Sequence, residues 1–210
     1  THPDFTLINI EHADREGMYL RRDTYEAFKK MYRAALEDSV KLIIRSATRN
    51  FEAQKGIWEA KWTGVRKIEN GENLALTTPD AKERALKILR YSSMPSTSRH
   101  HWGTDIDFNA FTNEFFKKGK GKKIYDWLTL NAASYGFCQP YSPIDEQRPN
   151  GYYEERWHWS YLPIAQPLTQ LAATQLKDEL ITGFKGAEAA TRIKVVENYV
   201  LGINEKCLSD

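Results

Sequence analysis

Two separate stretches of the chain carry the side chains of a metal site, and the fold must bring them together. Residues 98–107 read Ser-Arg-His-His-Trp-Gly-Thr-Asp-Ile-Asp, and residues 155–158 read Glu-Arg-Trp-His. Catalytic zinc usually takes three protein ligands, often histidines with one carboxylate, and leaves a fourth position for water. His100, Asp107 and His158 meet that count, which predicts a Zn2+ site built from both stretches.

Hydrolysis at such a site also needs a base and a cationic group. Glu155 lies three residues before His158 and is the candidate base, which would take a proton from water and pass it to the leaving amine. On a strand this spacing places two side chains on opposite faces, so a twist, bulge or turn is required there. Arg49, at the exit of a predicted strand, is the candidate for holding the scissile carbonyl and its developing oxyanion. Ser98 and Gln54 could hydrogen-bond a substrate carboxylate or amide.

Each of these motifs also has a simpler interpretation. A histidine seven residues before an aspartate is common by chance, and Glu-x-x-His arises often in aromatic strands. Arg49 taken alone is typical of a surface or salt-bridge residue. Asp105 could support a ligand or compete with Asp107 as one, and His101 is the weaker choice beside His100.

Composition and charge limit the class of protein. At 210 residues the chain fits one domain, or one domain with an appendage. Apolar residues make up 41% and aromatic residues 12%, which is typical of a globular protein. The formal charge of +2 gives no reason to expect a nucleic-acid partner, and the basic run at residues 117–123 is predicted to be a solvated loop before a helix. No apolar run approaches the roughly 20 residues of a membrane span.

The first residues and the cysteines leave the cellular compartment open. The start, Thr-His-Pro-Asp, does not look like a signal peptide, but a mature exported chain would look the same as a cytoplasmic one. Cys138 and Cys207 share no metal-ligand spacing, so they could be free thiols or one disulfide.

Local patterns predict an α+β fold, with a small antiparallel sheet flanked by helices and zinc at one end of the sheet. The predicted strands are residues 5–10, 41–46, 104–108, 137–141 and 152–161, the last two forming a hairpin. The predicted helices are residues 23–39, 50–62, 122–135, 168–180 and 187–201, with another that begins at Thr78-Pro79. Asp23 and Glu26 are expected to form a capping box, and Pro79 to take the first helical position.

Three motifs in the same order resemble those of a known family. They are Ser46-x-x-Arg49-x-x-x-x-Gln54, Ser98-x-His100-x-x-Gly103-x-x-x-Asp107 and Gly151-Tyr152-x-x-Glu155-x-Trp157-His158-x-x-Tyr161. Together they are similar to the signature of the zinc D-alanyl-D-alanine carboxypeptidases of the VanY kind, in the wider group of the VanX dipeptidases and the hedgehog signalling domain. The chain departs from the usual pattern at Asp105, Arg156 and Ser160, where the family commonly has Ala, Pro and Arg. These departures leave the substrate preference open.

The resemblance implies a fold and a set of site residues. It implies a hedgehog/D-Ala-D-Ala peptidase-like fold over residues 1–163, with residues 164–210 as a helical C-terminal extension packed on it. In such a fold the Glu-x-x-His segment brings both side chains to the metal. His100, Asp107 and His158 would then bind Zn2+, Glu155 would be the base and Arg49 the clamp on the carbonyl oxygen. The expected substrate-binding residues are Arg49, Gln54, Ser98 and Tyr152.

The resemblance also implies an activity and a location. The expected reaction is hydrolysis of the terminal D-Ala peptide bond of peptidoglycan stem peptides, in the periplasm or cell envelope. An L,D-carboxypeptidase or a peptidoglycan endopeptidase could use the same site. A non-catalytic zinc-binding module and a metal-free structural protein are the remaining alternatives, and the presence of Glu155 and Arg49 argues against the first of these two.

Overall fold

The fold is built around a four-stranded antiparallel sheet in the order β3-β4-β6-β5. The structure, a computed structural model, describes residues 2–208, and its central strands are β3 (Ile44–Ser46), β4 (Asp105–Phe108), β5 (Phe137–Cys138) and β6 (His158–Tyr161). A second, two-stranded sheet pairs β1 (Phe5–Leu7) with β2 (Tyr19–Arg21). The predicted class, a small antiparallel sheet flanked by helices, is confirmed.

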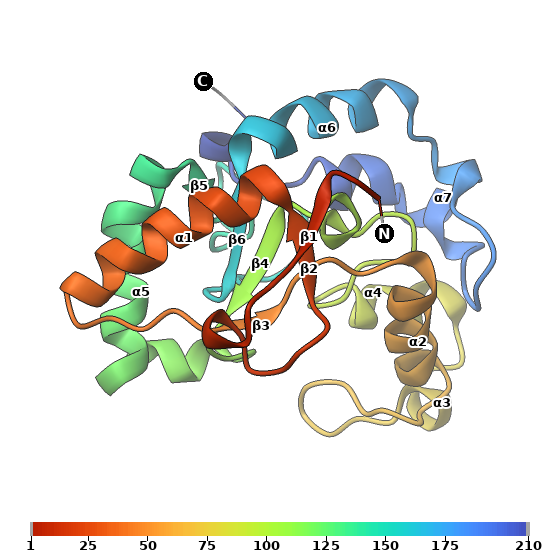
Figure 1. Cartoon of the computed structure of the whole chain (residues 1–210). Helices are drawn as coiled ribbons and strands as arrows, with labels where there is room; N and C mark the ends of the chain where they lie inside the picture. Colours follow the sequence, from red (N-terminus) through yellow and green to blue (C-terminus); the bar gives the residue numbers. More distant parts are fainter. Residues whose placement is uncertain (1, 209–210) are drawn as a thin grey trace.

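Helices flank the central sheet on two sides (Figure 1). On one side lie α1 (Arg22–Glu37) and α5 (Gly119–Asn131). On the other lie α2 (Phe51–Trp62), α3 (Leu74–Thr77), α4 (Ala81–Ile88) and α7 (Ala189–Ile193), while α6 (Leu162–Gln175) runs along the top of the view. Each side has its own apolar core, one containing Phe28 and Leu128 and the other Trp58 and Leu74.

The alternation of side chains along β4 separates apolar from acidic residues. Ile106 and Phe108 enter the first core, where Phe28 stacks on Phe108 with ring centroids 5.7 Å apart. Because successive side chains of a strand point to opposite faces, Asp105 and Asp107 lie on the other face. In the antiparallel register of β4 and β6, Asp105 lies opposite Ser160 and Asp107 lies opposite His158.

The beginning of α1 differs from the prediction. The helix begins at Arg22, and the N-cap residue Arg21 makes no side-chain cap. The capping box expected from Asp23 and Glu26 is therefore wrong, and Asp23 instead places its negative charge in the first turn of the helix. An acidic residue there still interacts favourably with the helix dipole.

The beginnings of α2 and α4 depend on their N-cap side chains. Asn50 caps α2 where the sequence indicates it. At α4 the cap is Asp80, whose carboxylate accepts a hydrogen bond from the Glu83 N–H at 2.9 Å. The expected position of Pro79 as first helical residue is therefore wrong, because the helix begins at Ala81 and the Asp80 side chain satisfies a backbone N–H of its first turn.

Other elements are shorter or longer than predicted. The strands predicted at residues 41–46, 137–141 and 152–161 contain only β3, β5 and β6, because their remaining residues bond to loops. The segment at residues 64–77, which falls outside the strands and helices predicted from the sequence, ends in α3. Helix α5 begins at Gly119, so part of the basic run predicted as a loop is helical.

The segment after residue 163 packs into the rest of the chain. Helix α6 follows β6 directly and includes Pro163 and Pro167, rather than beginning at residue 168. The helix predicted at residues 187–201 is divided into α7 and a π-helical turn, Val196–Val200. A disulfide joins Cys138 of β5 to Cys207, which settles the alternative between free thiols and a bond.

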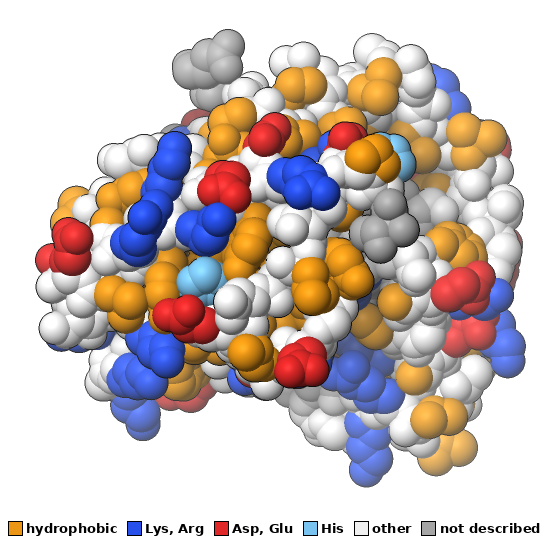
Figure 2. All heavy atoms as spheres, in the orientation of Figure 1, with side chains coloured by type: hydrophobic (Ala, Val, Ile, Leu, Met, Phe, Trp, Pro, Cys, Tyr) orange, Lys and Arg blue, Asp and Glu red, His pale blue; other side chains and the backbone are white. Residues whose placement is uncertain are grey.

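The surface and the helices bear on possible partners. On the face shown in Figure 2, basic and acidic side chains are interspersed instead of forming a field of one sign. Within residues 2–208, the helices are all too short or too polar to cross a lipid bilayer.

Candidate metal centre

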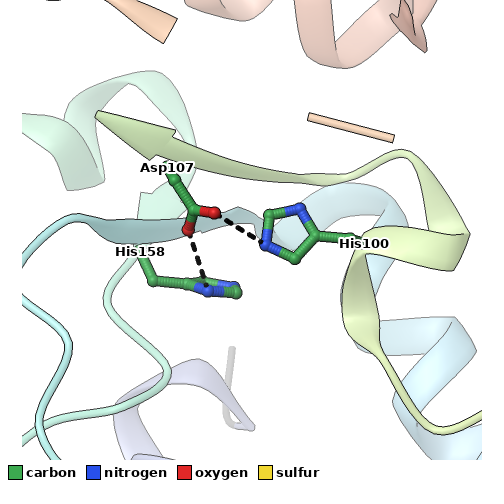
Figure 3. A group of neighbouring side chains, drawn as sticks. All are labelled: His100, Asp107 and His158. Atoms are coloured by element: carbon green, nitrogen blue, oxygen red, sulfur yellow. Dashed lines mark ion pairs between the residues drawn. The ribbon is translucent and has the colours of Figure 1, made fainter. Parts of the chain in front are cut away.

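His100, Asp107 and His158 meet in the structure, as the sequence predicts (Figure 3). All three side chains are buried, and one ligand atom from each lies within 4.8 Å of the others. Nε2 of His100 is 3.2 Å from Oδ2 of Asp107, and Nδ1 of His158 is 3.2 Å from Oδ1 of the same carboxylate. Ligands bound tetrahedrally at about 2.1 Å are about 3.4 Å apart. This separation is close to the spacing found here.

Local structure delivers each of the three side chains. His100 lies in a 3₁₀ turn, Arg99–Trp102, that ends at Gly103 in the left-handed region with φ of 73°. A Cβ at Gly103 would lie 2.4 Å from the Phe5 ring, so both the conformation and the space require glycine. Asp107 and His158 are direct partners across β4 and β6, which holds them on one face.

Glu155 lies in a turn and not on β6, which removes the conflict over its spacing. The His158 N–H donates to the Glu155 carbonyl at 3.2 Å, so the segment turns before the strand begins. Oε2 of Glu155 consequently lies 3.2 Å from Nδ1 of His158. Burial raises the pKa of Glu155, although His158 opposes the shift. A carboxylate with a raised pKa suits proton transfer near neutral pH.

Hydrogen bonds fix which ring nitrogens can bind a cation. His100 Nδ1 is 2.8 Å from the Ala47 carbonyl, which can only accept, so Nδ1 carries the proton. His158 Nε2 is 2.8 Å from Oδ1 of Asp105 and carries the proton in the same way. The other nitrogens, His100 Nε2 and His158 Nδ1, face the oxygens of Asp107. Burial lowers the pKa of His158, but its hydrogen bonds with Asp105, Asp107 and Glu155 raise that pKa well above the usual value, so a metal ion would have to displace a proton from Nδ1.

The buried polar atoms of this cluster fit a metal ion. His100 Nε2 and Asp107 Oδ1 are buried without a hydrogen-bond partner. Burial lowers the pKa of His100, with help from the charge of Arg49, and so favours the neutral ring that binds metals. A cation between the two rings and the carboxylate would accept these lone pairs. Nitrogen and oxygen donors in this set suit zinc among the common metals.

Asp105 contacts the candidate ligand His158 through Nε2, while the other ring nitrogen faces Asp107. Burial opposes its ionisation, but the charge of Arg99 and the hydrogen bond from His158 hold the pKa of Asp105 well below its usual range. Arg99 donates to Asp105 at 3.1 Å, to Ser160 at 2.8 Å and to Thr169 at 3.0 Å. The carboxylate is therefore a charged, fully held acceptor, an arrangement that favours support of His158 over a place among the candidate ligands.

Arg49 is tied to the loop that carries His100. Its N–H donates to the His100 carbonyl at 3.2 Å, and its own carbonyl is 2.7 Å from Nδ1 of His101. Its Nη1 donates to Ser46 Oγ at 2.7 Å and lies 3.7 Å from Oδ2 of Asp107. His101 thus braces Arg49 instead of joining the ligands, and the guanidinium lies at the edge of the cluster.

A cavity of about 950 Å³ opens over the cluster. Arg49, Gln54, Tyr152 and Glu155 all line it, together with the three candidate ligands. Gln54 donates to the Ser93 carbonyl at 2.7 Å and leaves its Oε1 buried without a partner. Ser98 is also buried, but it is not among the described residues that line the cavity.

Three polar residues of the site, Arg99, Thr169 and Lys61, were not predicted from the sequence. The charge of Arg99, between Ser98 and His100, was the available signal for the first of these. Thr169 is distant in the chain and polar residues of its type are common, so no signal indicated it. Lys61 shares a helical face with Gln54, seven residues away, and that spacing could have indicated a second polar group on the cavity wall.

Comparisons with known proteins agree with this arrangement. The sequence model of the VanY family, described as D-alanyl-D-alanine carboxypeptidase, matches residues 17–164. The putative carboxypeptidase YodJ of Bacillus subtilis (strain 168) is 26% identical over 166 residues, which cover 76% of this chain and 53% of YodJ. An uncharacterized protein of Haemophilus influenzae is 28% identical over 100 residues, or 41% of this chain and 70% of that protein. The chain thus matches only about half the length of YodJ.

Solved structures share the fold. The vancomycin resistance D,D-pentapeptidase VanY in complex with Zn(II) has a TM-score of 0.56 at 24% identity, covering 80% of this chain and 84% of that one. The LdcB LD-carboxypeptidase has a TM-score of 0.57 at 19% identity, covering 94% of this chain and 78% of that one. At these identities the likeness shows the fold, and it confirms the predicted hedgehog/D-Ala-D-Ala peptidase-like architecture.

Proposed function

The chain belongs to the VanY family of D-alanyl-D-alanine carboxypeptidases, and we propose that it is a zinc-dependent peptidase that removes the terminal D-alanine from peptidoglycan stem peptides. One observation carries the proposal. The buried ring nitrogens of His100 and His158 converge with the Asp107 carboxylate, while the Glu155 carboxylate lies beside them at the cavity. A site that only held a metal for stability would not need a carboxylate base and a cation on the same cavity wall.

Each residue has a role in the proposed reaction. His100 Nε2, Asp107 and His158 Nδ1 hold Zn2+, which when bound polarises the scissile carbonyl and lowers the pKa of a water molecule. Glu155 takes a proton from the attacking water and delivers it to the departing nitrogen. Arg49 donates hydrogen bonds to the carbonyl oxygen as negative charge develops there.

Other residues bind the peptide or hold the site in place. Gln54 and Tyr152 line the cavity and contact the substrate. Ser98, proposed from the sequence as a third contact, is the N-cap residue of the turn that contains His100, and its buried hydroxyl makes no hydrogen bond there. Asp105 orients the His158 ring through its hydrogen bond to Nε2.

Digestion of defined muropeptides tests the proposal. The zinc-loaded protein is incubated with a pentapeptide ending in D-Ala-D-Ala, a tetrapeptide ending in one D-Ala and a cross-linked dimer, and the products are weighed. Loss of one alanine from the pentapeptide supports the D,D-carboxypeptidase. Loss from the tetrapeptide instead would support an L,D-carboxypeptidase, which the comparable TM-score of LdcB makes the second candidate. Cleavage of the dimer alone would identify an endopeptidase.

The non-catalytic alternative has its own signature. A protein that binds about one zinc per chain and hydrolyses none of the three substrates would be a binding module. A protein that binds no zinc and hydrolyses none would overturn the proposal as a whole.

The proposed location is the cell envelope, where peptidoglycan lies. The Cys138–Cys207 disulfide supports it, because such bonds form and persist mainly in oxidising compartments.

A further inference from the structure

Lys61 is a buried cation on the wall of the cavity. It lies in the last turn of α2, and only 8% of its surface is exposed. Its ammonium donates to the hydroxyl of Ser92 at 2.6 Å, and both residues line the cavity. Among the described residues 2–208, no carboxylate oxygen lies within 4.0 Å of its Nζ, the distance that defines an ion pair. Its charge is therefore paired with a neutral hydroxyl alone.

Such a cation needs an anion. Burial, reinforced by the charge of Arg66, lowers the pKa of Lys61 to about 8, so the side chain is still mostly protonated at neutral pH. Glu69 and Glu155 raise the pKa from a distance but do not contact the amine. Buried charges in proteins are normally paired, because the loss of hydration is otherwise uncompensated. An unpaired ammonium on a cavity wall is thus prepared for an anionic ligand.

The position of Lys61 along α2 indicates which part of a ligand it would meet. Gln54, Ile57 and Lys61 line the cavity from one face of the helix. At a rise of 1.5 Å per residue, Lys61 lies about 10 Å along the axis from Gln54, and farther from Arg49 at the other end. An extended peptide advances about 3.4 Å per residue. Lys61 is therefore about three residues of extended peptide away from Gln54, on the side of the cavity that lies farther from Arg49.

We propose that Lys61 and Ser92 bind a carboxylate of the peptide substrate that lies away from the scissile bond, in the part of the cavity beyond Gln54. This rests on the proposed function, because it needs a peptide in the same cavity. Stem peptides offer two carboxylates of this kind, the α-carboxylate of the γ-linked glutamyl residue and the side-chain carboxylate of diaminopimelate. Binding either one would make Lys61 a specificity-determining residue for the anionic stem, separate from the terminal residue that is released.

Three synthetic pentapeptides ending in D-Ala-D-Ala test this subsite. The first carries the glutamyl carboxylate with lysine at the third position, the second carries neither carboxylate because glutamyl is replaced by isoglutaminyl, and the third carries isoglutaminyl with diaminopimelate. KM and kcat are measured for the zinc-loaded wild type, Lys61→Met, Lys61→Arg and Lys55→Met. Lys55 lies on the same helix but does not line the cavity, so it is the matched control.

The expected result is a change confined to substrates that bear the bound carboxylate. Lys61→Met should raise their KM about 10- to 100-fold, the range for a hydrogen bond to a charged group, with kcat within about threefold. The peptide without either carboxylate should show the same KM in Lys61→Met and wild type. Lys61→Arg should retain most of the affinity, and Lys55→Met all of it. An effect with the first peptide alone identifies the glutamyl carboxylate, and with the third alone diaminopimelate.

Other outcomes would overturn the assignment. An equal rise in KM for all three peptides would indicate a structural role for Lys61, and no rise for any of them would remove it from substrate binding. If the wild type hydrolyses none of the peptides, the proposed function fails, and calorimetric titration with the same peptides still tests Lys61. Binding that Lys61→Met weakens only for a carboxylate-bearing peptide would uphold the subsite, while binding that is carboxylate-independent, or absent, would refute it.

Discussion

Replacing Lys61 by methionine should stabilise the folded protein. Burial lowers the pKa of Lys61 from 10.5 to about 8, and each pKa unit corresponds to about 1.4 kcal/mol. At pH 7 the folded chain therefore loses about 3 kcal/mol by keeping this amine charged and buried. Methionine has a similar length and needs no hydration, so it removes this cost. Loss of the hydrogen bond to Ser92 returns about 1 kcal/mol, which leaves a net gain of about 2 kcal/mol.

The gain should depend on pH in a direction fixed by the pKa shift. The folded pKa lies below the unfolded one, so between pH 8 and 10.5 the unfolded chain binds more protons. Above the unfolded pKa the amine is neutral in both states, and Lys61 does not lower the free energy of unfolding. The cost of burying the charge grows as the pH falls and is complete below the folded pKa. The cost of about 3 kcal/mol at pH 7 should therefore shrink to about 1.5 kcal/mol at pH 9.5. The difference in free energy of unfolding between Lys61→Met and wild type should therefore fall by about 1.5 kcal/mol between these pH values, because the hydrogen bond to Ser92 contributes equally at both.

Urea unfolding of the metal-free protein, followed by tryptophan fluorescence at pH 7 and pH 9.5, measures both quantities. Lys55→Met is the control and should change the free energy of unfolding by less than about 0.5 kcal/mol at either pH. A difference between Lys61→Met and wild type that is the same at both pH values would refute the reasoning, because it would show that the pKa of Lys61 is not lowered in the folded protein. A variant that is more stable but binds the peptide more weakly is the expected result where a buried charge is kept for function.

Three further predictions concern the metal centre and the disulfide. Glu155→Gln should keep its zinc, measured by metal analysis, but lose about 10²- to 10⁴-fold in kcat, and near-full turnover would contradict the role of the base. Asp105→Asn should weaken zinc binding about 10- to 100-fold in a chelator competition, because the His158 ring loses its charged acceptor, while Asp126→Asn on the surface of α5 should leave the affinity unchanged. Equal affinities in the two variants would sink that account. Reduction of the disulfide, whose cysteines are 69 residues apart, should lower the free energy of unfolding by about 4 kcal/mol in urea titrations with and without reductant, and superimposable curves would contradict this.

The convergence of the three candidate metal ligands could be predicted from the sequence because local structure fixes most of their geometry. A 3₁₀ turn closed by Gly103 positions His100, and strand alternation positions Asp107, so each is determined within a few residues. What the sequence leaves open is the pairing of β4 with β6, which brings His158 opposite Asp107 across some fifty residues of chain. Only the order of the motifs indicated that contact.

The turn at Glu155 shows where spacing alone falls short. A separation of three residues puts two side chains on opposite faces of a strand but on the same side of a tight turn. The aromatic residues around Trp157 favour a strand, yet β6 begins only at His158. The hydrogen bonds of Glu155 and its neighbours to distant loops, such as that from the Glu155 N–H to the Tyr141 carbonyl, decide the local conformation.

Lys61 was missed for a different reason. Its burial depends on α4 and on the segment around Ser92, which cover the end of α2. A lysine in a helix is normally solvated, so the sequence favours exposure. The spacing from Gln54 can indicate a shared helical face, but only the tertiary arrangement buries this side chain in the cavity wall.

The departures of this chain from its family pattern at positions 105 and 160 are parts of one arrangement. Asp105 replaces the usual Ala and needs a buried cation, which Arg99 supplies at 3.1 Å. Ser160 lies opposite Asp105 across the sheet, where an arginine would meet the guanidinium of Arg99, so the small hydroxyl leaves the space and also donates to Asp105 at 3.0 Å. Removing one partner of a buried pair costs about 3–5 kcal/mol. Replacing Asp105 by Ala alone would therefore leave the buried guanidinium of Arg99 without its carboxylate partner.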